Sequence, residues 1–144
     1  MCAAVRVRSS NKLNQDGGRY TVLHRLTQSS GGVRLVEGND GALYAITAHG
    51  GIADYGTVLK LNKDGSGFVV LHEFRGSESD GYWPIGLLQA RDGMLYGSTT
   101  HGGTNGGGTI FQLNSDGTAY AVVRSFAVRC LGWLVARRSD ARKR

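Results

Sequence analysis

An internal repeat is the feature of this chain that most limits what it can fold into. The segment Asp40-Gly-Ala-Leu-Tyr-Ala-Ile-Thr-Ala-His-Gly-Gly51 returns as Asp92-Gly-Met-Leu-Tyr-Gly-Ser-Thr-Thr-His-Gly-Gly103, an offset of 52 residues (40 to 92). The register continues without a gap through Gly56-Thr-Val-Leu-Lys-Leu-Asn-Lys-Asp-Gly65 and its counterpart over 108–117. A fixed period of this order is typical of propellers and related arrays, in which each copy is one supersecondary unit.

A third, partial copy precedes these two. The segment Val22-Leu-His-Arg-Leu26 matches Val70-Leu-His-Glu-Phe74, which in turn matches Val122-Val-Arg-Ser-Phe126. Leu13-Asn-Gln-Asp-Gly17 matches the end of the segment that closes at Gly65. The first offset is 48 residues (22 to 70), so one connection is four residues shorter than its counterpart.

Each copy carries the signals of short β-strands. Apolar runs rich in β-branched and aromatic residues are separated by Asp-Gly or Gly-Gly pairs. In the run 57–61, Thr57, Leu59 and Leu61 share one face by the two-residue period of a strand, while Val58 makes the other face apolar as well. The Asn-x-Asp-Gly segments suit hairpin turns. One repeat is therefore expected to supply four strands, over 43–48, 57–61, 68–74 and 85–90.

Strands that are apolar on both faces indicate sheets with a neighbour on each side, as blades have around a propeller axis. The composition agrees, because 23 glycines and a single proline favour many turns between short strands. The sequence thus predicts an all-β fold of about three four-stranded antiparallel, blade-like sheets of a partial β-propeller. The tandem repeat domain covers 1–126, followed by a divergent basic tail; its parts are a partial blade 1–38, a repeat 39–90, a repeat 91–126, and the tail 127–144.

The chain departs from its own pattern after Phe126. The tail from Ala127 is open to three interpretations: a short helix, a substitute fourth strand, or the translation of an out-of-frame end. We favour a fragmentary or truncated origin. Because a closed propeller has four to eight blades, about three blades leave open edges, which favour self-association.

The charge distribution argues against nucleic-acid binding by the folded part. The formal net charge is +6, yet residues 13–126 hold eight Lys or Arg against ten Asp or Glu. The excess of positive charge therefore lies at the ends, and no folded basic face is predicted. No segment is apolar and long enough to span a membrane, and the N-terminal residues lack the apolar core of a signal peptide. Cys2 and Cys130 fit no metal-binding spacing, and a disulfide between them is unsupported.

Several motifs imitate ligand sites without their required partners. The histidines form two repeat-equivalent pairs, but no cysteine or carboxylate accompanies them at a metal-ligand spacing. The glycine-rich segment 101–109 lacks the Lys and the following helix of a phosphate loop. The Asp-Gly pairs lack the spacing of a calcium loop, so we expect them to be turns. No metal and no cofactor is predicted. The histidine pairs are His49 with His101 and His24 with His72.

Aromatic residues give the best candidates for a binding site. Tyr82 and Trp83 stand in a turn before Pro84, where exposed rings can stack on sugars or anchor a protein partner. Tyr44 and Tyr96 lie inside expected strands and are assigned to the core. No nucleophile with a partnered base stands out, so no catalytic residue is proposed.

The repeat motifs resemble a known family. Gly-Thr-Val/Ile-x-x-Leu-Asn-x-Asp-Gly, Val-Leu-His-x-Phe, Gly-Leu-Leu-x-x-x-Asp-Gly-x-Leu-Tyr-Gly-x-Thr and His-Gly-Gly are similar to the GloVer repeats of bacterial choice-of-anchor tandem-repeat proteins, over about residues 11–126. The resemblance implies a propeller-like protein that is secreted or attached to the cell surface, without an established enzymatic role.

These observations predict a non-enzymatic repeat scaffold, a binding or surface-display module whose partner is a protein or a carbohydrate. One alternative is a carbohydrate-binding propeller that uses Tyr82 and Trp83. The other is a fragment of a propeller hydrolase, because no sequence spacing shows which carboxylates of different blades meet in space.

Overall fold

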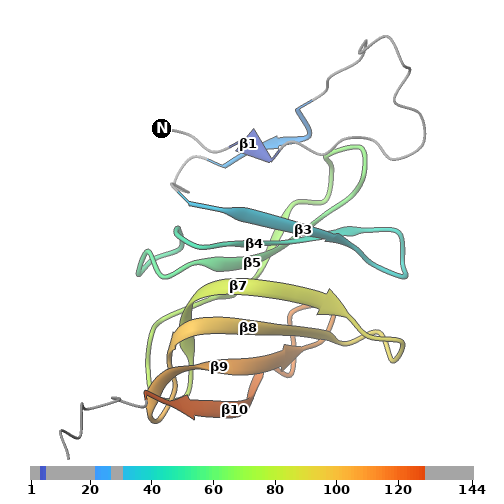
Figure 1. Ribbon diagram of the computed structural model, residues 1–144. Coiled ribbons are helices and arrows are strands. Elements are labelled where there is room, and N and C mark those ends of the chain that lie inside the picture. The colour runs from blue at the N-terminus through green and yellow to red at the C-terminus, as the bar shows by residue number, and fades with distance from the viewer. Residues whose placement is uncertain (1–3, 6–21, 27–30, 129–144) are drawn as a thin grey trace, which may run out of the picture.

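The computed structural model describes residues 4–5, 22–26 and 31–128, and this part of the chain is all-β, without a helix. Two four-stranded antiparallel sheets lie one above the other (Figure 1). A short two-stranded sheet of β1 (Ala4–Val5) and β2 (His24–Arg25) lies on the outer side of the first. Cys2, Cys130 and the tail from 129 onward lie outside the described residues.

The first sheet is a meander in the order β3-β4-β5-β6. Its strands are β3 (Val33–Glu37), β4 (Leu43–Thr47), β5 (Thr57–Leu61) and β6 (Val69–Glu73). The Asn-x-Asp-Gly turn between β5 and β6 closes as expected: the Gly65 N–H donates to the Asn62 carbonyl at 2.9 Å, and the Ser66 N–H donates to the Asp64 carboxylate at 2.9 Å. The same bonds recur in the next repeat, so these Asp-Gly pairs are turns.

The second sheet repeats this order as β7-β8-β9-β10. Its strands are longer: β7 (Gly81–Gln89), β8 (Leu95–Gly102), β9 (Gly106–Leu113) and β10 (Ala121–Ala127). The four strands expected from the repeat 39–90 all form, but they do not share one sheet, because the strand at 85–90 is part of β7 and opens the second sheet. Sheet boundaries are thus shifted from the repeat boundaries by one strand.

The core lies between the two sheets. The first sheet contributes Tyr44, Ile46 and Val58, together with Phe74 just after β6. These side chains pack against Leu95, Phe111 and Leu113 of the second sheet. All of these side chains are at most 1% exposed. At about 25 cal/mol per Å² of apolar area, such a cluster is the main stabilising contribution of the fold.

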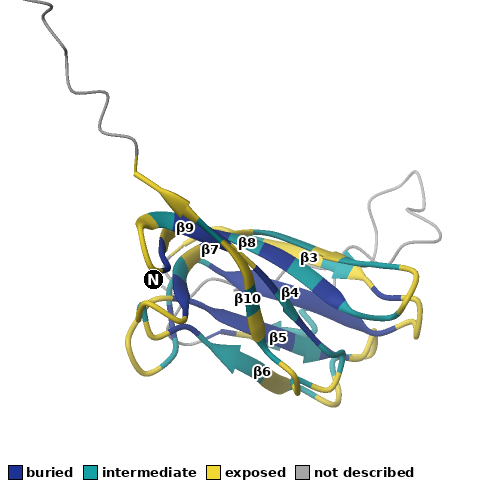
Figure 2. Ribbon diagram, turned by 90° about the horizontal axis from the view of Figure 1, so that it is seen from below, coloured by how far each residue is buried: buried dark blue, intermediate teal, exposed yellow. Residues whose placement is uncertain are grey.

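The first sheet is covered on its other face as well. There Leu26, just after β2, packs with Ala45 and Leu59, while Val33 and Phe68 border the cluster. Figure 2 accordingly shows β4 and β5 buried along their lengths, whereas β10 is largely exposed. The prediction of strands apolar on both faces is confirmed for the first sheet.

The segment at β2 contacts the first sheet as β6 contacts the second. His24 stacks on Phe68 with ring centroids 3.9 Å apart, and its counterpart His72 stacks on Tyr120 at 3.7 Å. Leu26 packs with Leu59 in the way that Phe74 packs with Phe111. The described residues therefore show two four-stranded sheets plus a two-stranded one. A third four-stranded sheet, expected from the sequence, is not among them.

Candidate functional site

An aromatic cluster gathers where the β4–β5 connection of the first sheet meets the ends of two strands of the second sheet. We define it by five side chains: His49, Tyr55, Tyr82, Trp83 and His101. Tyr82 and Trp83 start β7, Tyr55 and His49 belong to the β4–β5 connection, and His101 ends β8. Tyr55 is 37% exposed and Trp83 38%, so the rings are open to solvent while they pack on one another.

The rings of the aromatic cluster are in mutual contact. Tyr82 lies 4.9 Å from Tyr55, 5.3 Å from Trp83 and 5.2 Å from His101 between ring centroids. Trp83 also meets His101 at 5.0 Å, nearly edge to face, and His49 at 6.0 Å. These separations are within the range of favourable aromatic pairs, so each ring is held by its neighbours.

Trp83 is fixed by its backbone in an unusual conformation. Its φ is +55°, a left-handed value that a bulky residue rarely adopts. The Trp83 N–H donates to the Tyr55 carbonyl at 2.9 Å, and the Thr100 hydroxyl donates to the Trp83 carbonyl at 3.2 Å. These bonds tie β7 to the first sheet's loop and to β8, and together they hold a conformation that costs about 1–3 kcal/mol.

The loop that carries His49 and Tyr55 is itself closed by a carboxylate. Asp54 accepts a hydrogen bond from the Gly50 N–H at 2.7 Å and lies 3.4 Å from His49 Nδ1. Asp54 also has a positive φ of +57°. The loop therefore presents an imidazole, a phenol and a carboxylate beside the indole, a set that offers ring faces and hydrogen-bonding edges together.

The structure places both sequence-predicted candidates, Tyr82 and Trp83, in this cluster, but they lie in strand β7 and not in the turn expected before Pro84, because β7 begins at Gly81. The cluster also contains residues that sequence reasoning missed. His49 and His101 were assigned to structural loop positions, and Tyr55 was not singled out. Tyr44 is fully buried, as expected for a core residue. Tyr96 is only half-buried, because it lies on the face of the second sheet that points away from the core residue Leu95.

A second cluster joins the two sheets beneath the surface. Asp80, in the connection between β6 and β7, accepts hydrogen bonds from the Tyr120 hydroxyl at 2.5 Å and from the N–H groups of Arg75 and Gly81 at 2.8 Å each. Its Oδ1 also lies 3.3 Å from His72 Nε2. His72 and Arg75 lie in β6 and just after it, whereas Gly81 starts β7 and Tyr120 precedes β10. These contacts therefore link the two sheets, and we call this group the Asp80 cluster.

Electrostatics follow from these bonds. Burial by itself raises the pKa of Asp80, but the hydrogen bonds from His72, Tyr120 and two backbone amides outweigh it and hold that pKa below its usual range. Burial, followed by the hydrogen bond to the Asp80 carboxylate, raises the pKa of Tyr120. Asp80 is therefore an anion and Tyr120 a neutral donor at neutral pH.

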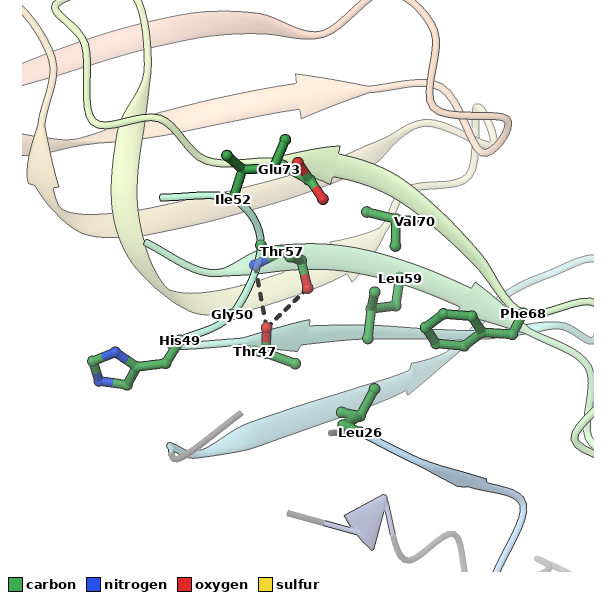
Figure 3. Close-up of a pocket in the computed structure, with 11 residues that line it drawn as sticks. Leu26, Thr47, His49, Gly50, Ile52, Thr57, Leu59, Phe68, Val70 and Glu73 are labelled. Atoms are coloured by element: carbon green, nitrogen blue, oxygen red, sulfur yellow. Dashed lines mark hydrogen bonds between the residues drawn. The ribbon is translucent and has the colours of Figure 1, made fainter. Parts of the chain in front are cut away.

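A shallow pocket of about 260 Å³ lies on the outer side of the first sheet (Figure 3). Leu26, Leu59 and Phe68 form its apolar side, and Thr47 and Thr57 pair through their hydroxyls at 2.9 Å. Leu26, which lines the pocket, occupies the repeat position of Phe74, the residue that packs against Phe111 of the second sheet.

The described residues contain no group of three or more His, Cys, Asp or Glu side chains placed to hold a metal ion. Nor does any helix with the length and apolar character of a membrane span occur in that part of the chain.

Comparisons with known proteins now define the family. A search of curated proteins and a search of solved structures each gave no match. The family model described as the Gloeobacter/Verrucomicrobia repeat matches residues 10–132, which is most of the chain and contains both four-stranded sheets. The chain therefore belongs to the Gloeobacter/Verrucomicrobia repeat family, in agreement with the resemblance to GloVer repeats.

Proposed function

We propose that the protein is a non-enzymatic binding scaffold, in which stacked repeat sheets form a rigid support and the aromatic cluster contacts the ligand. The observation that carries this proposal is the Trp83 backbone at φ +55°, held by hydrogen bonds to the β4–β5 connection and to β8 beside a half-exposed ring stack. Strained residues that the surrounding structure holds in place gather at ligand sites. Loops on a rigid scaffold are where binding residues concentrate.

The scaffold itself is proposed to be a partial β-propeller. Support comes from the repeat-equivalent contacts that β2 and β6 make, which give three successive layers related by one packing mode. β6 and β10 are edge strands of the described sheets, and such edges favour self-association. Light scattering over a concentration series tests this self-association. A molecular mass that stays at one chain at all concentrations would contradict association through the edge strands.

A carbohydrate is one candidate ligand of the aromatic cluster, favoured by the exposed indole and phenol rings of Trp83 and Tyr55. Flat aromatic faces stack on the C–H faces of sugar rings, and imidazole edges supply hydrogen bonds. A protein partner anchored on Trp83 uses the same rings, since Trp and Tyr are the commonest interface anchors.

Trp83→Gly is the variant that tests the cluster. Glycine adopts positive φ without strain, which offsets part of the packing lost with the indole, so the fold should be kept while the ring is removed. A glycan array and a peptide array are probed with the wild type, with Trp83→Gly, and with Phe126→Ala as a matched control that removes an exposed ring elsewhere. Binding lost only in Trp83→Gly supports the site; the array that retains the protein identifies the ligand class. Equal binding by all three proteins would contradict the site.

The non-enzymatic part has its own test. Wild-type protein is incubated with a panel of polysaccharides, and released reducing ends are measured. Asp54 and Asp80 are the carboxylates nearest the two clusters. Turnover that disappears in Asp54→Asn or Asp80→Asn would replace the scaffold by the hydrolase alternative.

The location of the protein outside the cell or on the cell surface is also proposed, on the basis of the resemblance to GloVer repeats. Antibody labelling of intact cells checks it. Labelling only after lysis would contradict that location.

A further inference from the structure

The second sheet exposes an apolar face on the side away from the first. Leu88 is 53% exposed, Ile110 36%, Val123 55% and Phe126 42%. Together with the half-buried Tyr96 we call these residues the outer face. They come from all four strands of the sheet, β7 to β10, so the outer face is continuous across it. Apolar faces of this kind mark interaction surfaces.

Each residue of the outer face has a counterpart 52 positions earlier that is covered by a sheet. Tyr44 and Val58 are fully buried, and Phe74 is 1% exposed. Val36 and Leu71 pack at the border of the same cluster. In the first sheet these positions are the contact surface for the second sheet. The outer face is thus the same contact surface, one repeat later, and no sheet among the described residues covers it.

The chain also shows what that surface binds. The second sheet meets it with a complementary face of large apolar residues at fixed positions: Leu87, Leu95, Phe111, Leu113 and Tyr120. Tyr120 in addition stacks on His72, and the residue that corresponds to His72 in the second sheet is Arg124. A guanidinium also stacks on an aromatic ring, so the outer face keeps a partner for such a tyrosine.

We propose that the outer face docks a further four-stranded sheet of the same repeat, in the way that the second sheet docks on the first. A second copy of this chain fits less well. Its first sheet would have to offer the equivalent complementary face, but Leu43, Leu59 and Leu61 there are only 2–3% exposed. The proposal extends the partial propeller of the proposed function, and its failure would leave ligand binding by the aromatic cluster untouched.

A repeat duplication tests the docking within the full chain. A copy of residues 75–126 is inserted between Phe126 and Ala127, so that it follows Phe126 as Arg75 follows Phe74. Amide hydrogen exchange is then measured by mass spectrometry in the original strands. If the new sheet covers the outer face, exchange in β9 and β10 slows by at least about tenfold relative to the parent chain.

A charge placed on the outer face separates docking from a general effect. Val123→Lys, in the original second sheet, should leave the parent chain folded with nearly unchanged exchange, because its side chain is more than half exposed. In the duplicated chain it should abolish the added protection. Val69→Lys is the matched control: it is also a half-exposed valine in an edge strand, but it lies in the first sheet and should have the same small effect in both chains.

Two results would overturn the proposal. The first is an inserted sheet that folds while β9 and β10 exchange as in the parent. The second is a parent chain whose β9 and β10 are already protected and lose that protection with Val123→Lys, since the face is then covered by a second copy or by residues 129–144. Sedimentation of the parent and of Val123→Lys distinguishes these two covers.

Discussion

The two four-stranded sheets share a sequence repeat and a strand order but differ in what covers them. In the first sheet, β4 is buried at every position, because the second sheet lies on one face and the N-terminal segment on the other. In the second sheet, β8 alternates between buried and half-buried positions up to Thr100, its His101 is exposed, and β10 is mostly exposed. The same residue type at the same repeat position is therefore core in one sheet and surface in the other.

Phe74 and Phe126 give the largest expected contrast. Phe74→Ala should lower the free energy of unfolding by about 3–5 kcal/mol, because it empties a site filled against Phe111 and Tyr120. Phe126→Ala should cost less than about 1 kcal/mol, since that ring is 42% exposed. Urea denaturation of both variants measures the pair. Equal losses would show that the outer face is covered in solution.

Asp80 tests whether the sheets unfold as one unit. Asp80→Asn weakens the bonds from Tyr120, Arg75 and Gly81 and should cost about 1–3 kcal/mol at neutral pH. Asp116→Asn, at an exposed turn, serves as the control with a smaller loss. Two separate unfolding transitions in Asp80→Asn would show that the contacts of Asp80 couple the unfolding of the two sheets. A stability equal to wild type would contradict that coupling.

The stability difference between wild type and Asp80→Asn should depend on pH, because the pKa of Asp80 is lowered in the folded state. A carboxyl whose pKa is lower in the folded state stabilises the fold fully above its unfolded-state pKa of about 3.9, and the contribution is lost as pH falls through the folded-state pKa. The stability difference between wild type and Asp80→Asn should therefore narrow in acid. Denaturation curves from pH 7 down to pH 2 check this, and a constant difference would contradict it.

A cross-strand pair shows how the repeat varies its packing. Ala45 pairs with Leu59 in the first sheet, and Gly97 pairs with Phe111 in the second. A Cβ at position 97 would overlap the Phe111 ring, so the larger ring requires the smaller partner. Gly97→Ala should cost about 1–3 kcal/mol. The double variant Gly97→Ala with Phe111→Leu copies the pair of the first sheet and should recover part of the stability lost in Gly97→Ala. A double variant less stable than the sum of both single losses would refute this compensation.

The smallest expected effect is at a turn. Gly67 and its counterpart Ala119 both have positive φ, +64° and +54°. Ala119→Gly should therefore stabilise the protein by up to about 1 kcal/mol, and Gly67→Ala should destabilise it by a similar amount or more. Thermal unfolding of the two variants measures opposite shifts. The reverse pattern, a lower melting temperature for Ala119→Gly and a higher one for Gly67→Ala, would mean that glycine entropy in the unfolded chain outweighs the turn strain.

Much of the fold could be predicted from local sequence. The strands at 43–48 and 57–61 and the Asp-Gly turns follow from two-residue apolar periodicity and from the turn conformations that Asp and Gly supply. The assignment of the strand at 85–90 to the wrong sheet has a physical reason. A repeat boundary in sequence is arbitrary, whereas hydrogen bonding joins β7 to β8 and leaves it separate from β6.

The candidate site was predicted only in part. Tyr82 and Trp83 could be found because two adjacent aromatic residues before a proline stand out in sequence, although they lie in strand β7 and not in the expected turn. Tyr55 could not, because only the packing of the β4–β5 connection against β7 brings it to Tyr82. Asp80 was read as one more Asp-Gly turn, and nothing local distinguishes it; its four partners come from three separate segments.

By itself the sequence determined the repeat, its family and the strands, since these depend on residue order and on interactions within a few residues. Only the tertiary structure decided which face of each strand is core, where one sheet ends and the next begins, and which rings form the aromatic cluster. The physical reason is that burial and stacking depend on a neighbouring sheet, and identical repeat positions have different neighbours in the two sheets.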